Sequence, residues 1–587
     1  MFAKVLIANR GEIAIRIIRT LREMGIASVA IYSQADRDAL HPRMAGEAYL
    51  AGPATPSQSY LNVDAILEIA ARSGADAIHP GYGFLAENAG FARRVVEAGL
   101  AWIGPHPGAI DAMGDKLRSR QAMLAANVPL VPGGTQPLAD LDAVKTAARE
   151  YGFPLALKAS AGGGGKGLKV ARSIGELEAA FGTARREAEA YFKDGTIYAE
   201  RYLDNPKHVE LQILADKHGN VVHVGERDCS LQRRHQKLWE EAPASIPDAV
   251  RMGIREAGVR AAKAIAYDSV GTVECLVSGN EFFFLEMNTR IQVEHTVSET
   301  IAGMDLVREQ IRVAAGEPLG YGQDAIDFRG HAIEVRVNAE DPADDFRPAP
   351  GTITSYREPA GLGVRVDSAA FAGVEIAPDY DSMIAKLVVW APTRPEAIAR
   401  LARAIDEYAI EGVPTTLPLL RALCDAPEVV DASYGTASLE AFATQLYAGG
   451  ATGAGRSFSF EPGTSRATVN GDLVAVEVDG RLYRVRVLDG IAGGRTAQVS
   501  GAKRDGSRTK RRVATVRGND VLSPMHGVVV ELTAGAGDSV AEGQVVAIVE
   551  AMKMMNEIRA HRSGTVAAVH AAAGETIEAN SPLVTID

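Results

Sequence analysis

Two acidic residues and an amide in neighbouring stretches of the chain could together hold a metal ion. Glu274 lies in the apolar stretch 271–277, and Glu286 and Asn288 belong to the stretch that begins with the aromatic run 282–285. Side chains two residues apart on a strand share one face, so two paired strands would bring these oxygens together. Carboxylate and amide oxygens suit Mg²⁺, and buried carboxylates need a cation. Core acids paired with arginines are the alternative.

The segment that follows directly, 288–295, concentrates groups that can handle a small anion and its proton. Arg290 supplies a cation, Gln292 an amide and Glu294 a carboxylate. Fixed cations bind anions through charge-assisted hydrogen bonds, and a nearby carboxylate can act as a general base. This spacing predicts an anion-activating site beside the metal site.

A glycine run at 162–165 invites comparison with a phosphate-binding P-loop. The comparison fails because residue 160 is serine and Gly167 stands where serine or threonine should follow the lysine. Glycine backbone N–H groups can still approach phosphate oxygens closely. Lys158, at the end of a strand-like stretch, can point at the same phosphates. We therefore predict a nucleotide site, with a plain flexible loop as the alternative.

Lys553 lies between Met552 and Met554 near the carboxyl end. The surrounding 70 residues contain a repeat, in which the segments that begin at Gly527 and Gly564 match at an offset of 37 residues. Two similar β-rich halves predict a small pseudo-symmetric β-sandwich, with Lys553 in a hairpin between them. Exposed methionines suit a recognition surface, although an ordinary hairpin tip is the alternative.

Residues 518–587 resemble a biotinyl carrier domain, in the motif around Lys553 and in the upstream Ser523, Pro524 and Met525. The resemblance implies that biotin is attached covalently to Lys553 by a biotin protein ligase. A lipoyl domain is the weaker alternative, because lipoyl lysines usually lack the paired methionines.

Residues 1–446 resemble the biotin carboxylases of the ATP-grasp superfamily. The resemblance is carried by the segment 288–295 and by Lys116, His208, Glu210, Gln232, His235, Lys237 and Arg336. One departure is Arg201, where the family often has lysine. Such enzymes use ATP and Mg²⁺, or Mn²⁺, to activate bicarbonate as carboxyphosphate and then carboxylate biotin.

This resemblance also implies a role for each site residue. The residues around ATP would be Lys116, Lys158, Gly163, Gly164, Gly165, Glu200, Arg201, Leu203, His208, Gln232, His235 and Lys237. The metal ligands would be Glu274, Glu286 and Asn288, and the bicarbonate ligands Arg290, Gln292 and Val293, the last through its backbone. The catalytic residues would be Glu294 as the base, Arg336 as the stabiliser of the biotin enolate, Lys237 and Arg290.

The elements that must position these residues can be read from hydrophobic periodicity. The predicted strands are 5–8, 29–32, 209–215, 221–226 and 282–286. The predicted helices are 11–24, 60–72, 91–98, 394–409 and 415–425. Alternation of strands and helices near the start implies a parallel sheet covered by helices.

The expected fold class is α/β multidomain: an ATP-grasp biotin carboxylase followed by a small β-sandwich biotinyl domain. The carboxylase would comprise a parallel α/β N-terminal domain, an ATP-grasp domain and a β-rich C-terminal subdomain. The predicted domains are 1–115 (N-terminal), 116–330 (ATP-grasp), 331–446 (carboxylase C-terminal), 447–517 (linker with a short β segment) and 518–587 (carrier).

Within the linker, 474–478 and 481–487 flank Asp479 and Gly480, a strong hairpin signal. The segment 457–517 is shorter than the barrel that bridges subunits in propionyl- and methylcrotonyl-type α-subunits, and we interpret it as a reduced version.

Composition excludes other classes of protein. A net charge of −12 argues against nucleic-acid binding. The absence of any apolar run of about 20 residues argues against a membrane span. Three scattered cysteines, with no signal peptide, favour the cytoplasm.

No second enzyme domain is recognisable, so we expect the carboxyl group to leave on biotin for a separate carboxyltransferase (β) subunit in a hetero-oligomer. The expected acceptor is an acyl-CoA, with acetyl-CoA or propionyl-CoA first. Methylcrotonyl-CoA and pyruvate carboxylases are alternatives. An unrelated ATP-grasp ligase that joins an amine to a carboxylate, and a non-catalytic carrier, are alternatives of other classes.

Overall fold

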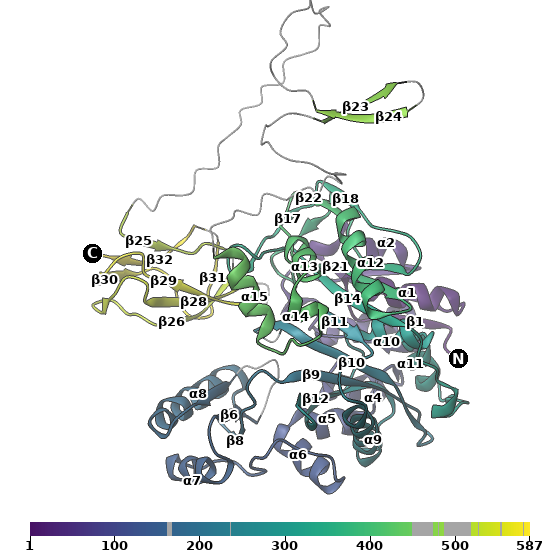
Figure 1. Ribbon diagram of the computed structural model, residues 1–587, viewed down its shortest axis with the longest axis horizontal. Helices are drawn as coiled ribbons and strands as arrows, with labels where there is room; N and C mark the ends of the chain where they lie inside the picture. Colours follow the sequence, from purple (N-terminus) through teal and green to yellow (C-terminus); the bar gives the residue numbers. More distant parts are fainter. Residues whose placement is uncertain are drawn as a thin grey trace, which may run out of the picture.

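The computed structural model describes residues 1–160, 167–234, 236–448, 473–478, 481–486, 518–525, 527–551, 554–578 and 580–587 (Figure 1). The predicted site residues that lie outside this described set are Gly163, Gly164, Gly165, His235 and Lys553. In the described part of the chain, no helix has the length and hydropathy that crossing a bilayer requires.

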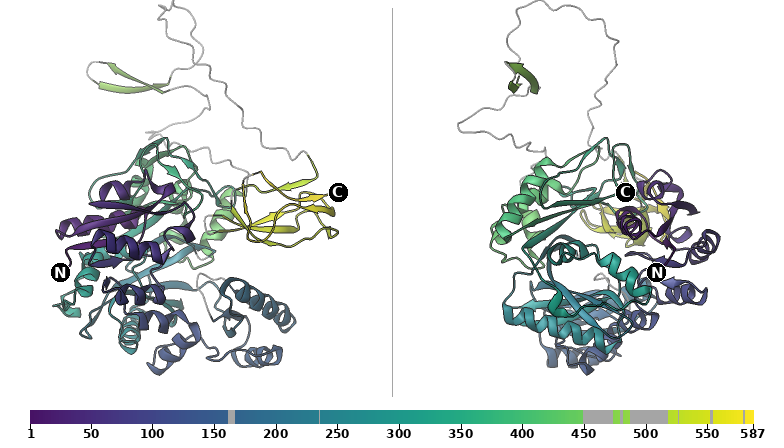
Figure 2. Two further views of the ribbon diagram at one scale, coloured as in Figure 1. Left: turned by 180° about the vertical axis from the view of Figure 1, so that it is seen from behind. Right: turned by 90° about the vertical axis from the view of Figure 1, so that its right-hand side faces the viewer.

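The N-terminal region forms a five-stranded parallel sheet in the order β3-β2-β1-β4-β5, drawn in purple in Figure 2. Its strands are β1 (Lys4–Ile7), β2 (Ala27–Ser33), β3 (Glu47–Gly52), β4 (Ala77–His79) and β5 (Ala101–Trp102). Its helices are α1 (Gly11–Glu23), α2 (Leu40–Met44), α3 (Val63–Ser73), α4 (Ala89–Glu97) and α5 (Pro107–Gly114). The parallel α/β prediction is therefore confirmed.

Helix α3 begins three residues later than the periodicity predicts. The side chain of Asn62 accepts a hydrogen bond from the backbone N–H of Ala65 at 3.1 Å, so Asn62 caps the helix. Tyr60, which was expected in the first turn, is instead buried against the sheet ahead of the cap.

An eight-stranded sheet in the order β13-β12-β9-β10-β11-β14-β21-β19 forms the centre of the molecule. Its strands are β9 (Lys207–Ala215), β10 (Val221–Arg233), β11 (Gln236–Ala242), β12 (Ser269–Ser278), β13 (Glu281–Asn288), β14 (His331–Asn338), β19 (Val364–Ser368) and β21 (Met383–Ala391). Pairing of β11 with β14 carries the sheet across the predicted limit at residue 330. The ATP-grasp and C-terminal parts thus share one continuous sheet.

Strand β10 continues seven residues beyond its predicted end at Glu226. Glu226, Arg227 and Asp228 are fully buried in it and are paired with other charged groups. Because these polar residues resemble a loop in the sequence, the hydrophobic pattern misses the second half of the strand.

Helices and short strands complete the carboxylase region. The helices are α6 (Lys116–Ala125), α9 (Asp248–Ala264), α10 (His295–Ala302), α11 (Leu306–Ala314), α12 (Arg394–Glu407), α13 (Leu417–Leu423), α14 (Pro427–Val430) and α15 (Ser438–Tyr447). The short strands are β15 (Glu340–Asp341), β16 (Arg347–Pro348), β17 (Gly351–Thr352), β18 (Ser355–Arg357), β20 (Glu375–Ile376) and β22 (Ala409–Glu411).

A smaller unit with its own apolar core flanks the large sheet. It consists of β6 (Leu155–Ala159), β7 (Leu168–Ala171), β8 (Ile197–Arg201), α7 (Leu141–Tyr151) and α8 (Leu177–Phe192). Lys158 pairs with Leu168 across the β6–β7 hairpin, so the glycine-rich residues connect these two strands. In Figure 1 this unit lies at the edge of the molecule, below the large sheet.

The carrier consists of two four-stranded sheets, β25-β32-β30-β27 and β29-β28-β26-β31. The strands are β25 (Asp520–Leu522), β26 (Gly527–Leu532), β27 (Ser539–Val540), β28 (Val545–Ala551), β29 (Met554–Arg559), β30 (Gly564–Val569), β31 (Thr576–Ile577) and β32 (Pro582–Ile586). The repeat relates β26 to β30 and β27 to β31, and β26 pairs with β31 while β27 pairs with β30. The β-sandwich prediction is confirmed.

Strands β28 and β29 pair as far as Ala551 and Met554. These two residues flank Met552 and Lys553, which lie outside the described residues. Farther upstream, β23 (Leu473–Val478) and β24 (Arg481–Arg486) form the hairpin predicted from Asp479 and Gly480.

Candidate active site

A cavity of about 790 Å³ lies between the N-terminal sheet, the large sheet and the carrier. The predicted catalytic or bicarbonate residues that line it are Lys237, Arg290, Val293 and Arg336. The carrier residues that line it are Gly527, Val528, Glu550 and Thr576. The views in Figures 1 and 2 agree that the carrier, drawn in yellow, lies beside the carboxylase region. One cavity therefore adjoins both the predicted catalytic cations and the carrier.

Lys237, on β11, contacts three buried carboxylates. Its ammonium donates to Glu294 Oε1 at 2.8 Å and to Glu274 Oε1 at 3.3 Å, and it also donates to Glu210. Burial alone would lower the pKa of Lys237, but the three carboxylates outweigh it and raise that pKa well above its ordinary value. Lys237 is therefore a permanent cation.

Glu294 is the N-cap residue that precedes helix α10, and it is 2% exposed. Its second oxygen, Oε2, accepts a hydrogen bond from Arg336 at 3.0 Å, and Arg336 Nε donates to Glu240 Oε1 at 2.7 Å. Burial would raise the pKa of Glu294, but Lys237 and Arg336 hold it low, at about 2. Glu294 is thus an ionised carboxylate with a cation on each oxygen. An anion that competes for those cations would free it to accept a proton.

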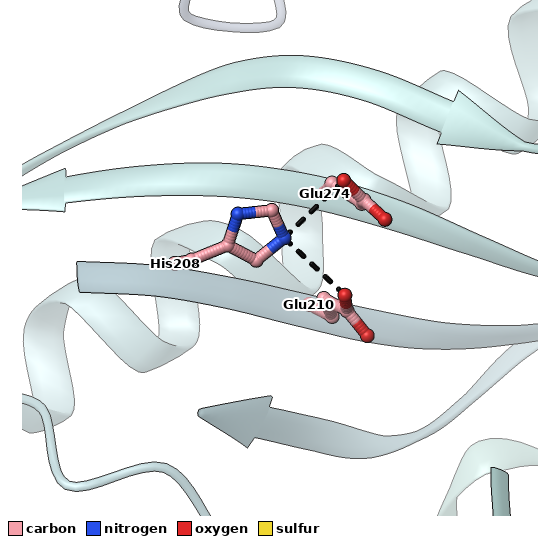
Figure 3. A group of neighbouring side chains, drawn as sticks. All are labelled: His208, Glu210 and Glu274. Atoms are coloured by element: carbon pink, nitrogen blue, oxygen red, sulfur yellow. Dashed lines mark ion pairs between the residues drawn. The ribbon is translucent and has the colours of Figure 1, made fainter. Parts of the chain in front are cut away.

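A second cluster lies on the neighbouring strands β9 and β12 (Figure 3). The Nε2 atom of His208 is 3.3 Å from Glu210 Oε1 and 3.2 Å from Glu274 Oε2. Burial would lower the pKa of His208, yet Glu274 and Glu210 raise it to about 9. A protonated imidazole donates hydrogen bonds and is a poor metal ligand. His208 therefore suits contact with an anion such as a phosphate.

The predicted metal ligands meet on paired strands. Glu274 on β12 lies opposite Glu286 on β13, and Asn288 lies opposite Thr272. Burial raises the pKa of Glu286, and the charge of Glu274 raises it further. The amide of Asn288 donates to Glu274 Oε1 at 3.1 Å. Two carboxylates that repel each other beside an amide form an oxygen-rich set that fits a divalent cation.

The predicted bicarbonate ligands lie on the loop between β13 and α10. Arg290 Nε donates to Glu87 Oε2 at 2.8 Å, and its Nη2 donates to Asn288 Oδ1 at 2.7 Å. Gln292 donates to Glu274 Oε1 at 2.9 Å. The loop therefore joins the metal candidates to Glu294 through direct contacts.

Two of the predicted nucleotide residues, Lys158 on β6 and Glu200 on β8, lie on the smaller unit. Lys158 and Arg120 both pair with the buried Glu200, Arg120 at 2.9 Å. Burial lowers the pKa of Lys116, and the charges of Glu286 and Lys158 act on it in opposite directions. Lys116 thus lies within electrostatic reach of both groups.

The remaining nucleotide candidates differ in their surroundings. Gln232 is buried on β10, the side chain of Arg201 is exposed at the end of β8, and Leu203 is half-buried just after that strand. The side chain of Arg201 makes no hydrogen bond or ion pair within the described residues, so its role stays a prediction.

Four known families match successive parts of the chain. Residues 1–110 match the N-terminal domain of biotin carboxylase, and residues 334–441 match its C-terminal domain. Residues 115–321 match the ATP-binding domain of the carbamoyl-phosphate synthase L chain. Residues 519–586 match the biotin-requiring enzyme family.

A relative from Mycobacterium leprae, a biotin-dependent acyl-coenzyme A carboxylase alpha3 subunit, is 44% identical over 100% of this chain and 98% of its own length. The chain belongs to the biotin carboxylase family. It is a ligase-type biotin carboxylase that carries its own biotinyl domain.

Other relatives of this biotin carboxylase cover less of it. A pyruvate carboxylase subunit of Methanothermobacter thermautotrophicus is 53% identical over 72% of this chain and 86% of its own length. The solved biotin carboxylase domain dimer of Hydrogenobacter thermophilus 2-oxoglutarate carboxylase, in complex with MgADP, ADP and bicarbonate, has a TM-score of 0.73 and 49% identity. That alignment covers 76% of this chain and 98% of that one.

Sequence reasoning missed three charged residues that this biotin carboxylase places around the site. Arg227 donates to Glu210 and Gln292, Glu87 pairs with Arg290, and Lys386 donates to the carbonyl of Val293. A charged residue inside a strand-like run, as for Lys386 within 383–391, was an available signal. Nothing near Glu87 in the sequence points to Arg290, which lies about 200 residues away.

Proposed function

We propose that the chain uses ATP, Mg²⁺ and bicarbonate to carboxylate a biotin carried on Lys553, and delivers the carboxyl group to a separate carboxyltransferase that acts on an acyl-CoA. The observation that carries this proposal is the buried Glu294 carboxylate held by Lys237 and Arg336, two cations that line the same cavity as the carrier.

ATP binds between the smaller unit and the large sheet in this proposal. Lys116, Lys158 and the protonated His208 neutralise its phosphates, and Gly163, Gly164 and Gly165 close over them. The residues assigned to the adenine side are Glu200, Arg201 and Leu203, and those assigned to the ribose and phosphates are Gln232, His235 and Lys237. The pairing of Lys158 with Glu200 supports a role for both at one ligand.

Glu274, Glu286 and Asn288 would hold Mg²⁺, or Mn²⁺ in its place. When bound, the ion neutralises charge on the phosphoryl group that is transferred. The raised pKa of Glu286, caused by burial and by Glu274, supports this assignment because a cation would relieve that repulsion.

Bicarbonate binds to Arg290, Gln292 and the backbone of Val293. Its charge competes with Glu294 for the cations Lys237 and Arg336, which frees an oxygen of Glu294 to remove the bicarbonate proton. Bicarbonate is a poor nucleophile until that proton leaves, so the base and the cations must lie together, as they do around Glu294.

Arg336 would hold the biotin oxygen on which negative charge develops, and Glu240 keeps its guanidinium in place at 2.7 Å. The carrier would present biotin here, since Glu550, three residues before Lys553, lines the same cavity. Tethering raises the effective concentration of biotin there.

An acyl-CoA is the favoured acceptor because a relative that aligns with the whole chain, carrier included, belongs to an acyl-coenzyme A carboxylase. Pyruvate or methylcrotonyl-CoA carboxylation is the second candidate, since a pyruvate carboxylase subunit is 53% identical over 72% of the chain. The matched family segments support the domain limits at 115, 330, 446 and 517. The partners in this proposal are a carboxyltransferase β subunit, in a hetero-oligomer, and a biotin protein ligase.

The test uses the biotinylated full-length chain. Radiolabel from bicarbonate should appear on the chain in an ATP- and Mg²⁺-dependent reaction, and should move to one acyl-CoA of a panel when the co-purified partner is added. ATP hydrolysis that ignores bicarbonate, with no label on the chain, would contradict the proposal. Transfer to pyruvate would select the second candidate.

A further inference from the structure

Lys386 is a fully buried lysine for which the reaction described above has no use. It lies on β21 with 0% exposure. The sheet register places Arg336 of β14 directly opposite Lys386, and Lys386 directly opposite Asp367 of β19. Directly opposed residues of antiparallel strands project from the same face. The three side chains therefore form one row across the sheet, with the predicted biotin-stabilising arginine at one end.

Two neighbours in that row hold two consecutive residues of the catalytic loop. Arg336 donates to the Glu294 side chain at 3.0 Å. Lys386 Nζ donates to the backbone carbonyl of Val293 at 2.9 Å. Because the peptide unit is planar, a fixed carbonyl on Val293 fixes the whole plane between Val293 and Glu294. The two cations thus hold the side chain and the backbone of one short segment.

Neighbouring carboxylates stabilise the charged form of Lys386. Glu12 Oε2, from α1, lies 3.3 Å from its ammonium, and Asp367 Oδ2 lies 3.9 Å away. Burial would lower the pKa of Lys386, yet Glu12, Glu334 and Asp367 raise it despite the opposing Arg365. Among the described residues, Lys386 is the cation that compensates the Glu12 carboxylate most, and Arg365 adds a smaller effect. Lys386 therefore links the N-terminal region, the large sheet and the catalytic loop.

We propose that Lys386 is a positioning residue, whose ammonium sets the Val293–Glu294 peptide so that bicarbonate is bound and deprotonated in one fixed geometry. It touches no substrate and acts through the loop. The proposal rests on the proposed function, because it takes Val293 and Glu294 as the bicarbonate-handling residues. The alternative is an ion pair that serves only to fasten α1 to the sheet.

The decisive variant is Lys386→Met, made in the biotinylated full-length chain. We expect kcat/KM for bicarbonate to fall about 10²-fold, the scale of a misplacement of about 1 Å in a reacting group, while KM for ATP changes less than about twofold. If Lys386 has only a structural role, the variant should be less thermally stable, and its kinetic constants for bicarbonate and for ATP should not differ in how they change. Unchanged bicarbonate kinetics, or equal changes for both substrates, would overturn the proposal.

A second variant covers the case in which Lys386→Met folds poorly, because it leaves Glu12 buried without a cation. The double variant Glu12→Gln/Lys386→Met removes both charges and should recover thermal stability while its bicarbonate defect persists. Recovery of bicarbonate kinetics along with stability would show that Lys386 acts only by pairing with Glu12.

Lys217→Met is the matched control. It makes the same substitution and removes a similar lysine-to-carbonyl bond, from Lys217 to Ala314 at 2.8 Å, away from the catalytic loop. Its bicarbonate kinetics should equal those of the unmodified chain. If the biotinylated chain without any substitution lacks bicarbonate-dependent ATP hydrolysis, the proposed function fails. That result is distinct from a difference in bicarbonate kinetics between the variants.

Discussion

The carboxylase region and the carrier bury different kinds of side chain. Around the large sheet, Glu210, Arg227, Glu334 and Lys386 are all fully buried. In the described part of the carrier, the buried core is aliphatic, and Ser523 is its one buried polar residue. Burying charges costs several kcal/mol per ion before pairing offsets it. The comparison indicates that the carboxylase region buries charged groups because its proposed chemistry requires them. The carrier needs only an apolar core that keeps the sandwich rigid.

The largest expected effect is a substitution in the carrier that abolishes labelling of the chain and leaves the activity of the carboxylase region intact. In Lys553→Arg, no radiolabel from bicarbonate should attach to the chain, because arginine cannot form the amide to biotin. Carboxylation of free biotin should continue, since the substitution leaves the site around Glu294 untouched. Labelled Lys553→Arg protein would place biotin on another residue.

Within the carboxylase region, Glu294→Gln should reduce carboxylation of free biotin by about 10²- to 10⁴-fold, the usual contribution of a general base. Glutamine keeps the size of the side chain but cannot take the proton. The matched control is Glu309→Gln, an acid that pairs with Arg312 outside the cavity, which should retain activity. Equal rates for the two variants would remove Glu294 from the mechanism.

In the carrier, Leu583→Ala should destabilise the sandwich by about 2–5 kcal/mol, because Leu583 is 0% exposed and its loss leaves a cavity. Calorimetry of the full chain should show the carrier transition at a lower temperature. Carboxylation of free biotin should stay unchanged, and a parallel loss of that activity would indicate that the two regions depend on each other.

The smallest effect concerns pH. Burial raises the pKa of Glu12 from 4.5 to about 7, with Lys386 opposing. The folded state therefore holds this proton more tightly than the unfolded state, so the contribution to stability is complete below pH 4.5 and is lost as pH rises to about 7. Glu12→Gln should flatten the stability profile of the carboxylase transition over that window. The carrier transition, with its uncharged core, should be the same in both proteins, and an unaltered carboxylase profile would contradict this account.

Parts of this arrangement follow from local sequence alone. The facing of Glu274 and Glu286 was predictable because two apolar runs joined by a short turn pair as neighbours. The hairpin strands on either side of Lys553 were predictable from the 37-residue repeat. In both cases the partners are close in sequence or related by an obvious duplication.

The contacts that escaped prediction join distant segments. Lys386 reaches Val293 across 93 residues, and Arg336 reaches Glu294 across 42. These pairs depend on the strand order of the eight-stranded sheet, which hydrophobic periodicity does not encode. The buried second half of β10 was missed for a related reason, since paired charges such as Arg227 look like a loop when their partners are unknown.

The exchange of strands in the carrier bears on how the protein is made. Because β26 of the first half pairs with β31 of the second, and β27 with β30, neither half can complete a sheet alone. The last strand, β32, lies between β25 and β30. The nascent chain must therefore include β31 and β32 before the sandwich can close. Lys553, the proposed biotin site, precedes β30, β31 and β32 in the chain, so the sandwich that would present it can form only after those strands have been synthesised.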